Sequence, residues 1–409
     1  LILDVKTSVI YQLNVTGTWV PSTTSTTYTG VINVSSFSWD VDTIADLIDS
    51  PIASTPTICQ GFHAIGDGGG GEFYYNGSLA RTNHNGITIT GCWVRLNYGN
   101  ISVFSAGAKG GTEDDTVVIN AALGVANSIG VDVDGVLSHR ISSSLELTGT
   151  AKLIGKSAGR VAQPTISATS ELLWYGDASE MLKLGHQASM IVGSGISNIR
   201  LDGRALATRC LSIKDHQHGR FSNVVLTGAT TDALYMTNSA DAPDPTGFST
   251  YEDLQISLRA GGTDSANGIT LDGIGGDFSG VTLCTLERVR IEHANGAGVK
   301  LNLRADGFTW IGLQIFRSSS ETGIGFWSSS TDDAQITSLH VFMSPIITSG
   351  IRIDNVNSAI GWRVVEGNDL DVNTGFSDIV TGIGGSVVSV TGTTSGLRSG
   401  PDRTLGWRD

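Results

Sequence analysis

Short runs of β-forming residues, separated by Gly, Asn, Asp and Ser, fill the chain from about residue 131 onward. Such runs favour strands, and the residues between them favour turns. Helical spacing occurs in two places. In the segment 41–50, Ile44, Leu47 and Ile48 share one face and Thr43 is a candidate N-cap. Between residues 112 and 130, a second predicted helix has an apolar face formed by Val117, Val118, Ala121, Ala122 and Val125.

The strand runs recur in pairs, which indicates an internal repeat. The first run of each pair begins at Asn223, Asp253, Arg288, Gly312 and Ser338. The second run begins at Ala233, Gly268, Gly298, Gly323 and Gly350. An earlier, looser pair begins at Asn198 and Cys210. The shorter repeats are about 25 residues long, and the longer ones contain inserts rich in Gly, Asp and Ser.

Each run is too short to bury a face alone, so equivalent runs of successive repeats are expected to pair. No tight hairpin turn joins the two runs of a repeat, which favours parallel pairing. The sequence predicts an all-β protein, a right-handed parallel β-helix with a helix covering its open end. We expect a strand-rich connector region at 1–100, the opening strand and capping helix at 101–130, the β-helix at 131–375 and a C-terminal β segment at 376–409. A β-sandwich, the alternative, predicts no two-run repeat.

Charge and composition narrow the possible partners. The chain has 25 Lys and Arg against 39 Asp and Glu, a net charge of −14, which argues against nucleic-acid binding. No apolar run has the length of a membrane helix, so we expect no membrane insertion. The 4 Cys are widely spaced, so we expect buried thiols, no metal site and no cofactor. Neither a Gly-Lys-Ser/Thr motif nor a helix follows the glycines at 68–71, which argues against a nucleotide-binding loop.

Two neighbouring motifs resemble those of a known group of proteins. One resembles the opening of pectate-lyase-like β-helices, in which a strand, a Gly-rich turn and a helix that begins with Asp-Asp-Thr precede the first coil; its residues are Phe104 to Gly111, Asp114-Asp115-Thr116 and Ile119 to Ala122. The other resembles the connector domain of tailed-phage tailspikes; its residues are 41–47, 61–76, Asn85-Gly86 and Trp93. Together they resemble the tailspikes that degrade bacterial surface polysaccharide.

This resemblance implies a phage tailspike that binds and degrades capsule, exopolysaccharide or O-antigen. It implies a homotrimer on the virion tail, acting at the host cell surface and joined to other tail proteins through its N-terminal region. A non-enzymatic, trimeric receptor-binding fibre has the same fold and is the main alternative. A secreted microbial polysaccharide lyase is another, although the connector-like region argues against it.

Hydrolysis of a sugar chain usually needs two carboxyl groups about 5 to 9.5 Å apart. Strands on adjacent coils lie about 4.8 Å apart, so carboxylates there can meet this condition. Glu252 and Glu287 hold equivalent positions, and we expect repulsion to raise the pKa of one of them. The predicted groove follows the first column, with Glu292, Glu287, Glu252 and Asp253 as catalytic candidates and Arg290, Gln314, Phe316, His340 and Phe342 as substrate-binding candidates. Glu252 and Glu287 stand just before the strand, and the others are expected to point outward.

The second strand column supplies further candidates. Asn302 and Trp327 are expected side by side as a sugar-binding platform. Asp272 is a further catalytic candidate, as a partner of Glu292 or Asp277.

Elimination is the alternative to hydrolysis, and surface packing is the alternative to both. A lyase would use Lys300 or His293 as a base and Arg290 to neutralise a uronate. In a purely structural interpretation, Asp253 and Arg288 form a surface ion pair, while outward phenylalanines form contacts between subunits.

Overall fold

The chain divides into two units, residues 1–38 and 39–409. In the first unit, β1 (Ile2–Asp4), β2 (Val9–Leu13) and β3 (Trp19–Pro21) form an antiparallel sheet. No helix among the described residues is long and apolar enough to cross a membrane. The computed structural model describes residues 39–50, 56–79, 85–96, 99–159, 170–186, 190–239, 244–258, 266–274, 280–294, 296–302, 305–306 and 308–316, and the strands at 2–4, 9–13, 19–21, 324–328 and 349–353.

The second unit begins with a small sheet and the first predicted helix. The helix, α1 (Ile44–Asp49), starts after Thr43, whose hydroxyl and backbone exchange hydrogen bonds with Asp46 in a capping box. Ile44 and Leu47 pack into a separate core with Phe73 and Trp93. The sheet has the strand order β4-β5-β6-β8-β7, with β4 (Trp39–Val41), β5 (Thr57–Cys59), β6 (Gly71–Tyr75), β7 (Ile89–Thr90) and β8 (Trp93–Arg95).

The Gly-rich segment before β6 is a loop organised by one carboxylate. Asp67 accepts hydrogen bonds from the backbone amides of Phe62 (2.8 Å), His63 (2.7 Å), Ala64 (3.0 Å) and Gly69 (2.9 Å). Burial alone would raise the pKa of Asp67, but these four amides lower it to about 2. The glycines thus bring backbone amides close to a side chain of the protein itself.

We expect this loop to loosen as the pH falls from about 4 to about 2. The pKa of Asp67 is lower in the folded chain than its ordinary 3.8, so the carboxylate stabilises the fold above that value and the contribution disappears on protonation. Amide exchange at Phe62 and Gly69 should therefore accelerate with acid, and Asp67→Asn should make it fast at every pH. Exposed Asp42→Asn is the control. Exchange in D67N that matches the wild type would contradict this role.

The capping helix forms where it was predicted, but its buried face differs. The chain opens the coil with β9 (Ile101–Ser102) and the 3-10 turn η2 (Val103–Ala106), and then forms α2 (Thr116–Ile129), which ends at Gly130 with φ 75°. The buried residues of α2 are Thr116, Ile119, Ala122, Leu123 and Ala126. Val117, predicted on the apolar face, is 79% exposed. The helix begins at Thr116, and packing on the first coil selects the face that contains its two largest buried side chains, Ile119 and Leu123.

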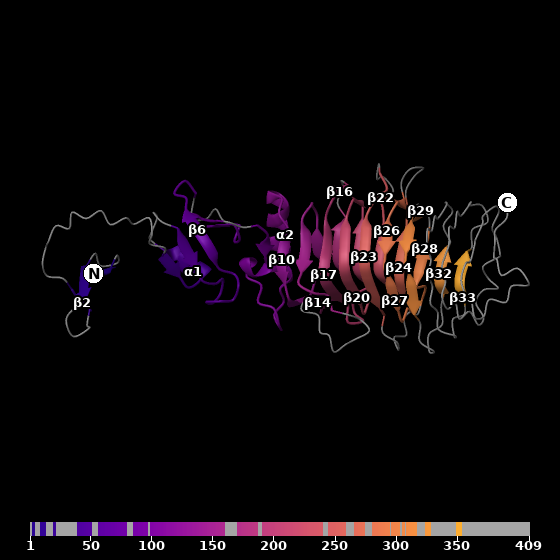
Figure 1. The fold of residues 1–409 in the computed structure, drawn as a ribbon, viewed down its shortest axis with the longest axis horizontal. Helices are drawn as coiled ribbons and strands as arrows, with labels where there is room; N and C mark the ends of the chain where they lie inside the picture. The colour runs from indigo at the N-terminus through magenta and orange to yellow at the C-terminus, as the bar shows by residue number, and fades with distance from the viewer. Residues whose placement is uncertain are drawn as a thin grey trace, which may run out of the picture. The chain divides into compact units, whose positions relative to one another are not determined.

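From β10 onward the chain winds through three parallel sheets (Figure 1). The first, which we call the bent sheet, contains β9, β10 (Val133–Val136), β11 (Ser138–Ile141), β13 (Lys152–Gly155), β14 (Glu171–Trp174), β17 (Gly195–Asp202), β20 (Arg220–Thr227), β23 (Thr250–Ser257), β26 (Thr285–Glu287), β27 (Arg290–Glu292), β30 (Thr309–Ile311) and β31 (Gln314–Phe316). The second sheet contains β12 (Leu145–Leu147), β15 (Glu180–Gly185), β18 (Arg209–Lys214), β21 (Asp232–Thr237), β24 (Asn267–Asp272), β28 (Val299–Leu301), β32 (Ile324–Ser328) and β33 (Ser349–Ile353). The third, short sheet contains β16 (Ile191–Val192), β19 (His216–Gln217), β22 (Thr246–Gly247), β25 (Val281–Thr282) and β29 (Ala305–Asp306). The predicted parallel β-helix is therefore confirmed.

The strand registers match the repeat in the first column. Val224 lies opposite Leu254, and Arg290 lies opposite Gln314, as the alignment of the runs predicts. In the second column the prediction is wrong by two residues at β32, because Val299 pairs with Phe326 rather than with Ile324. Glycines stand at both 323 and 325, so the pattern alone fits either register and keeps the same face inward.

The bent sheet changes direction at one residue in each coil. Equivalent positions there have left-handed backbone conformations: Asn198 (φ 57°), Asn223 (φ 51°), Asp253 (φ 55°), Arg288 (φ 55°) and Gly312 (φ 70°). Asn, Asp and Gly tolerate this conformation better than other residues do. The side chain of Asn223 also donates a hydrogen bond to that of Asn198 at 2.8 Å. The bend divides the sheet into two limbs, which explains why β26 and β27 are separate strands.

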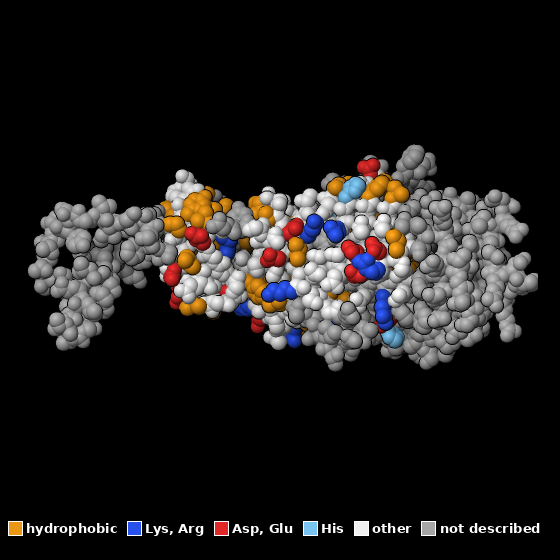
Figure 2. Space-filling view, viewed as in Figure 1, with side chains coloured by type: hydrophobic (Ala, Val, Ile, Leu, Met, Phe, Trp, Pro, Cys, Tyr) orange, Lys and Arg blue, Asp and Glu red, His pale blue; other side chains and the backbone are white. Residues whose placement is uncertain are grey.

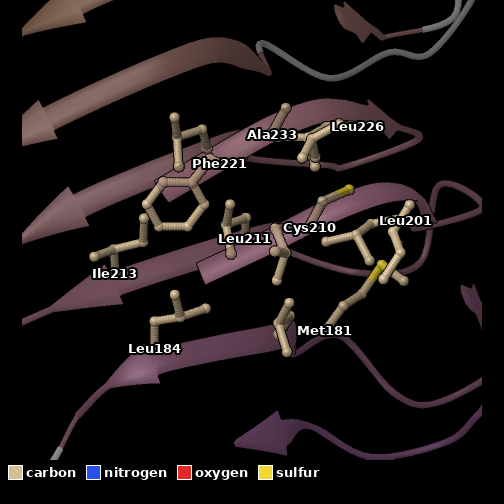
Figure 3. Close-up of a cluster of buried hydrophobic side chains, with 14 of the residues drawn as sticks. Met181, Leu184, Leu201, Cys210, Leu211, Ile213, Phe221, Leu226 and Ala233 are labelled. Atoms are coloured by element: carbon tan, nitrogen blue, oxygen red, sulfur yellow. The ribbon is translucent and has the colours of Figure 1, made fainter. Parts of the chain in front are cut away.

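Apolar side chains from successive coils fill the interior. Figure 3 shows Leu184, Leu211 and Ile213 directed into the same space as Phe221. The rings of Phe221 and Tyr251, which lie opposite each other in β20 and β23, stack with centroids 4.5 Å apart. All 4 Cys are buried free thiols, as predicted.

Candidate functional site

Three predicted catalytic carboxylates surround one arginine at the bend. The Arg288 guanidinium donates to Glu252 Oε1 at 2.6 Å (Nη2) and to Asp253 Oδ1 at 2.6 Å (Nε), and it also contacts Glu287. Glu252 and Glu287 are direct neighbours in β23 and β26, as predicted. We call Glu252, Asp253, Glu287 and Arg288 the corner cluster. Figure 2 shows a compact group of acidic side chains around a basic one on this face.

The corner cluster is a shared ion pair on the surface. The hydrogen bonds that Arg288 donates to Asp253 and then to Glu252 raise its pKa above the ordinary value. Side-chain exposures of 32% to 48% mean that water screens these pairs. The positive charge of Arg288 lies between Glu252 and Glu287 and reduces their mutual repulsion. That repulsion was the reason to expect one of them to act as an acid. Arg288 already acts as the cation of this group, and the exposed carboxylate oxygens are suited to orienting hydroxyl groups.

Glu292 lies further along the same outer face and is nearly buried. Its side chain is 11% exposed and contacts Arg290 at 2.5 Å. Ser257 and Phe316 occupy the neighbouring strand positions, and Gln255 and Gln314 flank Arg290. The structure thus brings together Arg290, Glu292 and Gln314 as predicted. The other predicted members of these rows, His340 and Phe342, lie outside the described residues.

The second-sheet candidates lie apart from this group. Asp272 belongs to β24 of the second sheet, where its carboxylate accepts a hydrogen bond from the Tyr235 hydroxyl at 3.0 Å. Asn302 donates its backbone amide to Leu271 at 2.7 Å and so follows β28 on the next coil. The expectation that Trp327 lies beside Asn302 is wrong, because Trp327 pairs with Lys300 as a consequence of the register shift at β32.

Two carboxylates that the sequence analysis missed stand on adjacent coils of the second limb. Glu171 of β14 lies opposite Arg200 of β17, and Asp202 follows two residues later with Leu173 as its partner. Alternation directs Glu171, Arg200 and Asp202 to the same outer face. The strand spacing and the rise per residue put the Cα atoms of Glu171 and Asp202 about 8 Å apart. Carboxyl groups at the ends of side chains that start from these positions can stand about 6.5 to 9.5 Å apart, the separation found in inverting glycosidases.

The two carboxylates have different surroundings. The Glu171 side chain is 19% exposed, and its Oε1 lies 3.6 Å from Arg200 Nη1, a long ion pair. Burial raises the pKa of Glu171 above its usual value; the charge of Arg200 opposes this shift and that of Asp202 adds to it. Asp202 accepts a hydrogen bond from the Arg204 backbone amide at 2.9 Å. A carboxyl group with a raised pKa beside a second carboxyl group on one face is the combination that acid–base cleavage of a glycosidic bond uses.

The sequence contains one weak signal of this pair. Glu171, Leu173 and Tyr175 are outward positions that alternate with buried ones. This alternation is typical of a strand and puts Glu171 on its outer face. The segment 156–169 separates this strand from β13, so Glu171 does not stand at the repeat distance from its neighbours. No group of three or more His, Cys, Asp or Glu that could hold a metal ion occurs within the described ranges.

Two solved structures with similar folds are phage tailspikes. The tailspike protein of Acinetobacter phage vB_ApiP_P1 is 16% identical with a TM-score of 0.56, and the match covers 87% of this chain and 70% of that one. The tailspike of Acinetobacter baumannii bacteriophage Fri1, a capsular polysaccharide depolymerase, is 13% identical with a TM-score of 0.53, and the match covers 89% and 76%. No protein-family model and no curated protein sequence matches the chain. The chain has the parallel β-helix fold of these phage tailspikes.

Proposed function

We propose that the chain is a phage tailspike that binds and cleaves bacterial surface polysaccharide. The observation that carries the proposal is the pair of Glu171 and Asp202, one carboxyl with a raised pKa beside another on the outer face of adjacent coils. The likeness to the Fri1 tailspike, a capsular polysaccharide depolymerase, supports the assignment to this class. A stack of coils also presents a long polar face, which suits a polymer.

In the proposed reaction Glu171 is the general acid and Asp202 the general base. Glu171 donates its proton to the oxygen of the glycosidic bond, and that bond breaks as the oxygen leaves. Asp202 takes a proton from a water molecule, whose oxygen forms the new bond to the anomeric carbon. Arg200 can hold the negative charge that Glu171 acquires when it has given up its proton.

The carboxylates predicted from sequence form a second candidate group on the same sheet. Glu252, Asp253, Glu287 and Glu292 would then act as base or nucleophile, while Asp272 stays a separate candidate on the second sheet. Arg290, Gln314 and Phe316, with Asn302 and Trp327 on the second sheet, are proposed contacts for the polymer. If the polymer carries uronates, Lys300 or His293 as base would allow elimination instead.

The activity is tested with purified protein and polysaccharides from a panel of bacterial hosts. We expect size-exclusion profiles of a host polysaccharide to shift to shorter chains, with new reducing ends. Ultraviolet absorbance from an unsaturated uronate would assign elimination. Binding without shortening in every host would instead support the receptor-binding fibre, for which the neutralised carboxylates of the corner cluster also provide an argument.

We also propose a homotrimer on the phage tail, with the N-terminal region bound to other tail proteins. A stripe of exposed side chains at one corner of three successive coils supports side-by-side packing of copies: His218, Phe248 and Leu283, with φ of 53°, 53° and 50°. Phe248 is 37% and Leu283 52% exposed, and His218 stacks on Phe248. Figure 2 shows apolar side chains and a histidine along this edge. Apolar groups held outward on unfavourable backbone suit an interface.

Phe248→Glu combined with Leu283→Glu should convert the trimer to monomers, because charges in an apolar contact are desolvated without partners. Analytical ultracentrifugation at micromolar concentration measures the change. The control is Ile274→Glu, since Ile274 is 56% exposed outside the stripe. A trimer that withstands the double substitution would place the interface on another edge.

A further inference from the structure

Next to Glu171, two arginines converge on one exposed tyrosine. Tyr175 follows β14, and its side chain is among the exposed aromatic groups at 40%. The guanidinium carbon of Arg140 lies 4.4 Å from the ring centre, and that of Arg204 lies 4.0 Å from it. Arg140 comes from β11, the strand before β14, and Arg204 follows β17, the strand after it. The ring therefore stands between cations from the two neighbouring coils.

The backbone holds both arginines in place. Arg204 has a left-handed conformation (φ 54°) and donates its amide to Asp202 Oδ1, so a tight turn at the end of β17 sets its direction. Arg140 lies within β11 opposite Leu173, and its Nη1 reaches the Thr112 carbonyl at 3.4 Å. The arrangement is thus formed by regular strands and a turn.

These two cations have an unusual electrostatic setting. Among the described residues, neither Arg140 nor Arg204 forms an ion pair with a carboxylate, although the chain has 39 Asp and Glu and a net charge of −14. The Nε atom of Arg140 is also buried without a hydrogen-bond partner in that part of the chain. Two neighbouring guanidinium groups repel each other, and an aromatic face compensates for this only in part. An anion at the edge of the ring, within reach of both guanidinium groups, would accept hydrogen bonds from their accessible N–H groups.

We propose that Arg140 and Arg204, held around Tyr175, bind the carboxylate of an acidic sugar in the polysaccharide. This inference rests on the proposed function, and it identifies the substrate class as an anionic glycan. A planar guanidinium matches a carboxylate with two parallel hydrogen bonds, which an ammonium group does not provide. The acidic side chain of Asp202 stands beside the clamp, which disfavours a dense polyanion such as nucleic acid. A glycan with well-separated carboxylates provides a carboxylate for the two arginines and avoids the high charge density of a polyanion.

The test compares binding of galacturonate oligomers and galactose oligomers of equal length to the full chain by titration calorimetry. We expect the acidic oligomer to bind at least tenfold more tightly, and Arg204→Ala to abolish that difference. Arg204→Lys should restore less than half of the lost discrimination, because the charge remains while the planar fork is lost. Tyr175→Phe, which keeps the ring, should bind like the wild type.

The control is Lys183→Ala, which also removes one positive charge. Lys183 belongs to β15, the strand of the second sheet that follows Tyr175 along the chain, and it pairs with Glu146 at 3.7 Å. Equal affinity for the two oligomers, no binding of either, or unchanged discrimination in R204A would overturn the inference. Competition by acetate as strong as by galacturonate would reduce the clamp to a general anion site and would also refute it. Because binding needs no turnover, galacturonate binding without cleavage of any host polysaccharide would refute the proposed activity alone.

Discussion

Replacing Glu171 by Gln should reduce the rate of polysaccharide cleavage at least a hundredfold. General acid catalysis contributes about 10² to 10⁴ in rate, and an amide of the same shape has no proton of comparable acidity to donate. The variant should fold normally. Because burial raises the pKa of Glu171, the ionised group is less stable in the folded chain than in water, so at neutral pH an uncharged side chain there should not destabilise the fold.

The measurement is the release of reducing ends under single-turnover conditions, with pH varied from 4 to 9 in the assay. For the wild type, activity should decline as pH rises through the elevated pKa of Glu171, because the acid is then deprotonated. Glu146→Gln, an exposed glutamate on the second sheet, is the control. Full activity in E171Q together with a large loss in E252Q, E287Q or E292Q would move the active site to the carboxylates predicted from the sequence.

Asp115→Ala should destabilise the β-helix by about 1 to 3 kcal/mol, as is typical when a buried polar group loses its hydrogen-bond partner. Asp115 is 3% exposed, and His139 is fully buried. The Asp115 carboxylate accepts hydrogen bonds from the Lys109 amide (2.9 Å) and the Gly110 amide (2.7 Å), and its Oδ2 lies 2.7 Å from His139 Nδ1. The side chain therefore connects the Gly-rich turn, the start of α2 and the first coil. Its removal takes away the hydrogen-bond partner of two backbone amides and of the buried His139 ring.

Denaturant unfolding followed by circular dichroism measures this change. Asp115→Asn should destabilise the fold less than Asp115→Ala, because the amide oxygen still accepts one or two of the three bonds. Exposed Glu113→Ala is the control, with an expected change within about 0.5 kcal/mol. A D115A variant with the midpoint of the wild type would show that the capping helix and the first coil hold together without this carboxylate.

The sequence predicts the coil because apolar residues recur at intervals that only stacked strands can bury together. Val224, Leu254 and Leu313 are buried as the repeat requires. Periodicity does not determine register where two spacings bury the same face, which explains the error at Phe326. The bend had a signal in the residues equivalent to Arg288, which are Asn198, Asn223, Asp253 and Gly312, but Arg288 itself does not reveal its left-handed backbone.

The site was harder to predict than the fold, for a physical reason. Glu252 and Glu287 are adjacent, as their equivalent positions require. Their electrostatic state depends on where the long Arg288 side chain lies, and sequence spacing does not determine that. The repeat did not predict Glu171, because the chain before this residue departs from the repeat length. Burial of that carboxyl follows from packing in three dimensions, and a one-dimensional pattern contains no measure of it.

The strands stay in register although the connections between them differ in length. The chain from Leu254 to Val289 is longer than that from Val289 to Leu313, yet Gln255, Arg290 and Gln314 still pair in sequence. Connections in such a solenoid can therefore lengthen, shorten or be exchanged while the stacked framework keeps its geometry. Recombination can thus give such a chain new surface loops without the need to evolve a new scaffold.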